Sequence, residues 1–303
     1  MRSILRVGNK IIAVILILLT VTAVFIPSFG IFNNVQDYLV HFLFFLLVSG
    51  LIGLVIGNQT ILFTSFGCAA ILAIFLKNAS NTELKDPNIN DEIRLSVAHL
   101  NLSLITDVKD VMKVLSHPEI EVVSFQEYTP DWGNIIPMIS DSFPYSFKDV
   151  RIDLYGKALF SKYKIVHSEI IDHQGIPNLI VKVQKDENEF TIYSAYLTPA
   201  LDKNSKLMAR HQIEILEKII NQDKDNLIVM GEFNQVYWSH DIISFRNKTS
   251  LLNSRRTVNP STFKMPYDHI FYTPSLECYY FEDLIDTSAN HIGCLGSFQL
   301  KKN

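Results

Sequence analysis

Three long apolar stretches fill most of residues 1–80 and constrain the fold more than any other feature of the chain. They span Ile11–Ile26, Leu39–Gly57 and Ile61–Leu76, and the links between them are too short to hold soluble structure. A helix needs about 20 apolar residues to cross the hydrocarbon core of a membrane, and about 17 is the lower limit. The middle stretch meets this length, and the outer two meet it once flanking neutral residues are included. We therefore expect residues 1–78 to form an anchor of three transmembrane helices.

Two other interpretations of these stretches explain less. Arg2, Arg6 and Lys10 precede the first stretch, as basic residues do in a secretory signal peptide. A signal peptide leaves the two following stretches unexplained. A soluble bundle of three such helices would be apolar on every side, which is unlike a surface that faces water.

The basic N-terminus predicts the orientation of the anchor. Cytoplasmic loops carry an excess of Lys and Arg, so the N-terminus is expected inside and the link at 27–38, which has neither, outside. Three crossings then place the remainder of the chain outside the cytoplasm, although Lys77 lies on the wrong side for this rule. We expect an integral membrane protein, of the inner or plasma membrane in a bacterium, with an extracytoplasmic soluble domain.

The sequence pattern changes after the third stretch. Residues 79–92 are polar, rich in Asn and broken by Pro87, and they predict a linker. Residues 93–303 predict a domain of short apolar strands, several of them continuous enough to be buried on both faces. The strands are expected at Leu95–Leu100, Glu121–Phe125, Ala158–Ser161, Leu179–Gln184, Glu189–Tyr196, Leu227–Met230 and His269–Thr273. Asp107–Leu115 and Leu207–Ile220 have helical apolar spacing instead, which favours stacked sheets flanked by helices.

The charge of this domain bears on its partners. Residues 1–92 carry five basic and five acidic side chains, so the formal net charge of −4 falls on the rest of the chain. A domain that binds long nucleic acid presents a basic face, so nucleic acid is not expected as the main partner, although a local basic groove is not excluded. Cys278 and Cys294 are open to two interpretations, a disulfide or two buried thiols.

Polar residues gather where the predicted strands end or begin. They are Asn101, Gln126, Glu127, Glu232, Asn234, Asp268, His269, Asn290 and His291. A single carboxylate at a strand end is more often solvated surface than a ligand. Five such strand ends in one domain predict a site at the edge of the sheets.

These motifs resemble those of the endonuclease/exonuclease/phosphatase superfamily over about residues 93–303. Asn101 matches the family's Asn after the first strand, and Gln126 with Glu127 matches its Gln-Glu pair. YGKALFSKYKI resembles its Gly-x-x-x-x-Ser-Arg/Lys strand, GEFN its Gly-Asp-Phe-Asn, and SANHIG its Ser-Asp-His before a closing strand. EYTPDW, TF…YDHIF and the three spans resemble its membrane-anchored branch. The resemblance implies an α/β fold, a four-layer α/β/β/α sandwich preceded by three transmembrane helices.

The resemblance also implies a metal and a substrate. Glu127 would hold Mg²⁺, or else Mn²⁺ or Ca²⁺, because a carboxylate is the hard oxygen ligand these ions prefer. Asn101 would contact the metal or the phosphate. Asp153 and Tyr155, which precede the Gly156 strand, would add substrate contacts.

The remaining expected roles concern the reaction. Glu232 would orient or deprotonate the attacking water, and Asn234 would donate to phosphate oxygens. His291 would face the phosphate from the opposite side, with Asp268 in support.

Three catalytic positions depart from the family pattern. Glu232 replaces Asp and is one methylene longer, and a displacement of about 1 Å can cost about 10²-fold in rate. Asn290 replaces the Asp before the last His and lacks its orienting charge. Tyr196 replaces a His, so it donates a hydrogen bond but brings no positive charge at neutral pH.

Several functions therefore stay open. One is an altered but working phosphoesterase, acting on a lipid-linked phosphate if the anchor keeps its site near a membrane. Another is a catalytically impaired membrane protein that binds phosphate or metal, which Asn290 and Tyr196 favour. A third is a nuclease, against which the acidic balance of the domain counts.

Overall fold

The computed structural model describes residues 2–25, 36–83, 87–89, 93–256 and 267–301. These residues belong to two compact units. The first holds the three N-terminal helices together with Val236–Ile243, and the second holds all the strands. Most of the predicted link at 27–38 and part of the predicted linker at 79–92 lie outside the described residues.

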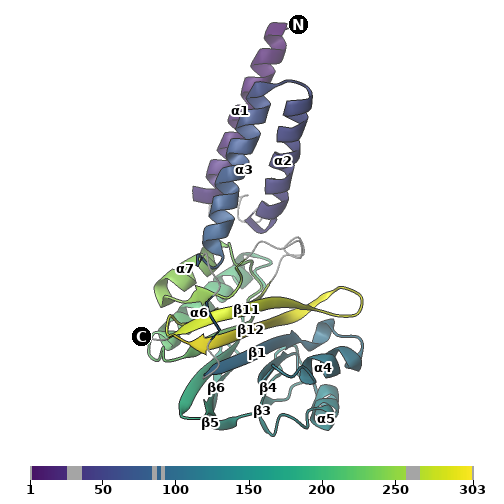
Figure 1. Cartoon of the computed structure of the whole chain (residues 1–303), viewed down its shortest axis with the longest axis vertical. Helices are drawn as coiled ribbons and strands as arrows, with labels where there is room; N and C mark the ends of the chain where they lie inside the picture. The colour runs from purple at the N-terminus through teal and green to yellow at the C-terminus, as the bar shows by residue number, and fades with distance from the viewer. Residues whose placement is uncertain (1, 26–35, 84–86, 90–92, 257–266, 302–303) are drawn as a thin grey trace. The chain divides into compact units, whose positions relative to one another are not determined.

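Three helices form where the apolar stretches predict them. They are α1 (Arg2–Phe25), α2 (Leu39–Val55) and α3 (Gln59–Ala79) (Figure 1). By length and composition alone, α1 and α3 are able to cross a membrane, whereas α2 is a shorter apolar helix. Large apolar side chains on these helices are exposed, and Val55 reaches 85%.

Two six-stranded sheets form the second unit, and each contains one parallel pair among antiparallel neighbours (Figure 1). The first sheet has the order β11 (Leu276–Ile285), β12 (His291–Leu300), β1 (Arg94–Asn101), β2 (Val122–Gln126), β4 (Lys157–Ser161), β3 (Tyr145–Asp149). The second has the order β5 (Lys164–His173), β6 (Ile176–Lys185), β7 (Asn188–Tyr196), β8 (Leu227–Glu232), β10 (Asp268–Tyr272), β9 (Leu252–Asn253). All seven predicted strands are present, and β12 is the closing strand that the resemblance implies.

Helices cover the outer face of each sheet. On the first sheet, Val111 of α4 (Val108–Leu115) and Ile136 of α5 (Pro130–Ile139) share a buried core with Phe125 of β2. On the second, Gln212 of α6 (Lys203–Ile220) bonds to the main chain at Thr198, and Phe245 of α7 (His240–Thr249) packs on β10. The chain is therefore a four-layer α/β/β/α sandwich, as expected, and α4 and α6 are the two predicted helices.

Four strands were missed, β3, β5, β9 and β11, and two of them, β5 and β11, are long strands that lack an apolar run. In β5 most side chains are exposed, and in β11 only Leu276 and Cys278 are buried, while the rest of this acidic strand is part-exposed or exposed. Edge strands of this kind carry little periodic signal. The short helix α5 was also missed, because it contains Gly133 and Pro137, which are poor helix formers.

The period of two in a strand decides which side chains face the interior between the sheets. In β1, Val97 belongs to the core between the sheets, and Ala98 and Leu100 belong to the core beneath α4 and α5. Continuing this alternation turns His99 and Asn101 toward the opposite sheet. The same alternation on the neighbouring strands brings further polar residues to this face.

Strand register collects these residues into two rows at one end of the sandwich. In the first sheet, Gln126 of β2 lies opposite Asn101 of β1 and Lys157 of β4, and these three residues form the first row. In the second sheet, Glu232 of β8 lies opposite Tyr196 of β7 and Asp268 of β10, and these three residues form the second row. Gly231 makes this second row possible, because a Cβ at its φ of +144° would lie 2.0 Å from the carbonyl oxygen of Ala195.

Candidate active site

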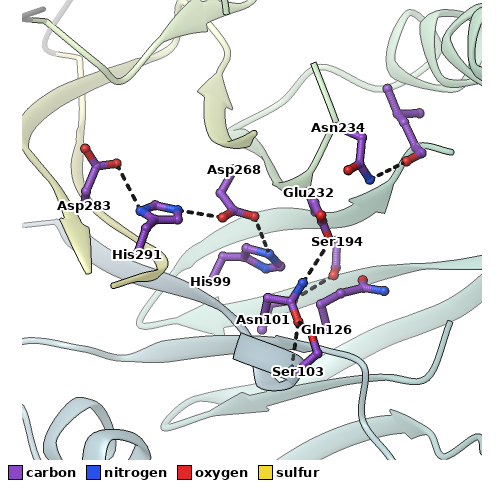
Figure 2. A network of polar contacts seen from close by, with 12 residues as sticks. His99, Asn101, Ser103, Gln126, Ser194, Glu232, Asn234, Asp268, Asp283 and His291 are labelled. Atoms are coloured by element: carbon purple, nitrogen blue, oxygen red, sulfur yellow. Dashed lines mark hydrogen bonds and ion pairs between the residues drawn. The ribbon is translucent and has the colours of Figure 1, made fainter. Parts of the chain in front are cut away.

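One hydrogen bond joins the two rows across the space between the sheets. The side-chain amide of Asn101 donates to Oε2 of Glu232 at 2.9 Å (Figure 2). Its carbonyl oxygen accepts from the backbone N–H of Ser103 at 3.0 Å and from the Ser103 hydroxyl at 2.8 Å. Because a backbone donor fixes the orientation of the amide, Asn101 presents its NH₂ group to the site and its oxygen is already occupied.

Glu127, expected to hold the metal, follows β2 in a left-handed conformation with a φ of +58°. Tyr128 fixes this turn by donating from its backbone N–H to the Gly156 carbonyl at 2.9 Å, and a Cβ at Gly156 would lie 2.4 Å from the Tyr128 carbonyl oxygen. Among the described residues, no hydrogen bond or ion pair engages the Glu127 carboxylate. Asn234, which follows β8, is left-handed as well, with a φ of +52°. Strain of this kind costs about 1–3 kcal/mol and is concentrated at functional sites.

Negative charge is concentrated around Glu232. Burial, and then repulsion from Asp268 and Glu127, raise the pKa of Glu232 to about 8, although Lys157 and Asn101 oppose the rise. A nearby cation would relieve this repulsion. Within the described ranges, no group of three or more His, Cys, Asp or Glu side chains converges as a metal site. A single carboxylate such as that of Glu127, completed by several waters, is how Mg²⁺ is usually bound.

Lys157 is a site residue that the sequence did not single out. It is fully buried in the first row, and its Nζ donates to Oδ1 of Asn178 and to the Ser194 carbonyl, both at 3.1 Å. Burial lowers the pKa of Lys157 well below its usual value, although the charge of Glu232 opposes this. A lone Lys at a strand end usually faces solvent, so nothing in YGKALF indicated this position.

Tyr196 closes the second row. The Tyr196 backbone N–H donates to Oδ1 of Asn178 at 2.6 Å, and the ring meets that of Tyr155 edge-on at 5.7 Å between centroids. Burial, and then the charge of Glu232, raise the pKa of Tyr196, so its hydroxyl stays a hydrogen-bond donor at neutral pH. Asn234 lies beside it, with its amide donating to the Leu197 carbonyl at 2.9 Å.

Asp268 lies between two histidines, as Figure 2 shows. Its Oδ2 is 2.6 Å from Nε2 of His291, and its Oδ1 is 3.3 Å from Nε2 of His99. Burial alone would raise the pKa of Asp268, but the hydrogen bond from His291 and the close contact with His99 outweigh it and hold the pKa well below the usual value. For His291, burial lowers the pKa, but Asp268 and then Asp283 outweigh it and raise the pKa.

A second carboxylate stands on the other side of His291. Oδ1 of Asp283 lies 3.9 Å from Nδ1 of His291. Asp283 is itself held by both terminal nitrogens of Arg255, at 2.6 and 2.5 Å, and this ion pair is almost completely buried. His291 is therefore flanked by negative charge at both ring nitrogens.

Asn290 does not face His291. Its backbone N–H and its side-chain amide donate to the two carboxylate oxygens of Asp286, at 2.7 and 2.9 Å. The missing acidic group at position 290 therefore does not leave His291 without an orienting carboxylate, because Asp268 bonds to its imidazole.

The loop before β4 contributes unequally. Asp153 is bound by Arg151 through three hydrogen bonds of 2.8–3.0 Å, and the bond from Arg151 is the main reason that the pKa of Asp153 is lowered. Its carboxylate is therefore occupied at the surface of the loop. Tyr155 reaches the site through its contact with Tyr196.

The cysteines do not form a disulfide. Cys278 lies opposite Phe298 and Cys294 lies opposite Asp283 in the pairing of β11 with β12, and both thiols are buried and free. The second interpretation of these residues, as buried thiols, is the one the structure has.

Comparison with known proteins identifies the site's family. The model of the Endonuclease/Exonuclease/phosphatase family matches residues 98–290. No curated protein sequence matches the chain.

Solved structures share this fold over about two thirds of the chain. D. rerio TDP2 complexed with single-strand DNA product has a TM-score of 0.53 at 17% identity, over 68% of this chain and 99% of that chain. The human Nocturnin catalytic domain with bound sulfate anion has a TM-score of 0.53 at 17% identity, over 69% of this chain and 95% of that chain. The mannosyl-6-phosphatase of Bacteroides thetaiotaomicron has a TM-score of 0.53 at 15% identity, over 69% of this chain and 100% of that chain. At such identities the likeness shows the fold, and the family match extends over more than half of the chain. The chain belongs to the endonuclease/exonuclease/phosphatase family.

Proposed function

We propose that the protein is a membrane-anchored phosphoesterase that depends on a divalent metal ion. One observation carries the proposal: the Asn101–Glu232 hydrogen bond and the His291–Asp268 pair join residues of both sheets into a single polar site next to Glu127. Members of this family are typically hydrolases of phosphoester bonds, so the site has the fold that such chemistry uses.

Glu127 would hold Mg²⁺, with Mn²⁺ or Ca²⁺ as alternatives, and the bound ion would neutralise charge on the phosphate. Glu232, held by Asn101, would orient the attacking water and take its proton. A base works best when its pKa lies near the operating pH, and the pKa of Glu232 is about 8 before a metal binds.

The opposite side of the phosphate would meet hydrogen-bond donors. His291, protonated between its two carboxylates, would place positive charge on that side of the phosphate. The Tyr196 hydroxyl and the Asn234 amide would donate without carrying charge. Tyr155 would contact the substrate beside Tyr196.

The N-terminal helices support the membrane part of the proposal. Two of them have the length and hydropathy of spans, and the basic residues before the first favour a cytoplasmic N-terminus and an extracytoplasmic domain. An anchor of this kind would keep the site beside lipid, which favours a lipid-linked phosphate as the substrate.

Two other functions remain as alternatives. An impaired protein that binds phosphate or metal without turnover is favoured by Tyr196, which brings no positive charge, and by the longer Glu232. A nuclease is favoured by the fold shared with TDP2, which was solved with a DNA product. The acidic balance of the domain counts against long nucleic acid.

The test is hydrolysis by the full chain in amphipol, with Mg²⁺, Mn²⁺ or Ca²⁺ and a panel of diesters, monoesters, lipid pyrophosphates and plasmid DNA, measured by the product each substrate releases. Glu127→Gln should abolish turnover, and Glu214→Gln, an exposed change on α6, should leave it intact. A folded chain that binds the ion without turnover would favour the binding protein. Metal-dependent nicking of plasmid DNA would favour the nuclease.

A further inference from the structure

Large apolar side chains are exposed on three loops around the site. The loops are 102–107 after β1, 150–155 before β4 and 197–202 after β7. The exposed residues on them are Leu104, Val150, Ile152, Leu154 and Leu201, which together we call the apolar rim. Ile152 is 93% exposed and Leu201 is 89% exposed. Single exposed apolar residues are common, but five around one site need an explanation.

Hydrogen bonds bring the three loops to the same end of the sandwich. The loop of Leu104 begins at Asn101, whose amide reaches Glu232. The Leu154 carbonyl accepts from the Gln126 side chain at 2.9 Å, which fixes its loop beside the first row. The third loop starts at Leu197, whose carbonyl accepts from Asn234 and whose backbone N–H donates to the Glu232 carbonyl at 3.0 Å.

The rim also lacks free positive charge. The charged residues of the three loops are Asp107, Arg151, Asp153 and Asp202. Asp153 occupies the guanidinium of Arg151, and Asp107 and Asp202 cap α4 and α6. A polyanion needs cations along its path, so the surroundings of the site suit an apolar group better than a nucleic acid backbone.

We infer that the apolar rim binds the hydrocarbon chain of an amphiphilic phosphoester, an alkyl or isoprenyl phosphate, while the phosphate occupies the site. The inference rests on the proposed function, because it assigns a subsite for that substrate. The rim stands on loops tied to rigid strand ends, so little ordering cost opposes the burial of its side chains against a chain. Burial of apolar surface then gives the preference for a long chain.

The test compares the full chain in amphipol, without lipid, on two soluble diesters. Methyl p-nitrophenyl phosphate and dodecyl p-nitrophenyl phosphate, below its micelle concentration, share one leaving group and differ in chain length. The variant is Ile152→Ser with Leu201→Ser, two exposed changes expected to leave folding intact. The control is Val166→Ser on β5, an exposed change near the Phe190 end of its sheet, opposite the Tyr196 end.

On the dodecyl ester, the double variant should lose about tenfold in kcat/KM for each of its two substitutions, and each tenfold corresponds to about 1.4 kcal/mol. The rate on the methyl ester and all rates of the control should be unchanged. Equal rates of variant and wild type on the dodecyl ester would overturn the inference. A loss that appears only when lipid vesicles are added would also overturn it, because the rim would then bind a membrane surface.

Failure of the proposed function would look different. If neither ester is hydrolysed with any divalent ion, the proposed turnover fails. Calorimetry of methyl phosphate and dodecyl phosphate binding then tests whether the rim binds a hydrocarbon chain. Tighter binding of dodecyl phosphate that the double variant loses and the control keeps supports the subsite. Equal binding of both phosphates by the wild type rejects it.

Discussion

Nε2 of His291 lies 2.6 Å from Oδ2 of Asp268, although the two residues belong to different sheets. His291 opens β12 and Asp268 opens β10, so the pair exists only when the sheets are stacked. The carboxylate holds the imidazole in one orientation and favours its protonated form.

Asp268→Asn should lower kcat by about 10⁴, the loss seen when a carboxylate that orients a catalytic histidine is changed to the amide. Asn290→Ala should change kcat by no more than about threefold, because Asn290 faces Asp286. Steady-state kinetics of both variants with Mg²⁺ checks this. Similar losses in the two would mean that Asn290 acts on His291.

Asp283→Asn should lower the pKa of His291, because it removes one of two carboxylates that raise it. The stabilisation from protonated His291 is full below about pH 6.5, the unfolded value, and is lost as pH rises through the raised folded value. Activity that needs protonated His291 should fall over the same pH range, and in Asp283→Asn this fall should occur at lower pH. Proton NMR titration and the pH dependence of kcat measure the shift. If the fall of activity with pH does not move, it would be due to the titration of another group.

Glu232→Gln should remove a loss of stability at alkaline pH. The pKa of Glu232 is raised from 4.5 to about 8, so its protonated form favours the folded state. That contribution is complete below pH 4.5 and is lost as pH rises through about 8. Without divalent ions, the wild type should lose about 2–4 kcal/mol of unfolding free energy between about pH 5 and 9. Urea denaturation of both proteins checks this, and parallel pH curves would contradict it.

Lys157→Met should lower the free energy of unfolding by about 1–3 kcal/mol, because the Ser194 carbonyl is left buried without this donor. It should also raise the pKa of Glu232 further, since Lys157 opposes that rise. Denaturation and the alkaline stability limb of the variant give the two readouts. A stabilised variant would show that burying the amine costs more than its bonds return.

The sequence by itself determined most of the buried elements and the family. Hydropathy was enough to place the three helices, and apolar runs marked strands such as β1, β2 and β8, because burial on both faces leaves a local pattern. Motifs at the strand ends named Asn101, Glu127 and His291 because the family's chemistry needs those residue types there. Strands without such runs, β5 and β11, left no comparable signal.

Only the tertiary structure decided which residues meet. Asn101 and Glu232 are 131 positions apart, and stacking of the two sheets turns both inward at one end. The same stacking buries Lys157 and gives His291 its carboxylate from Asp268, while Asn290 turns to Asp286. A strand's own sequence sets which side chains share a face, but the partner across the interior depends on how separate sheets pack, and no local pattern records that.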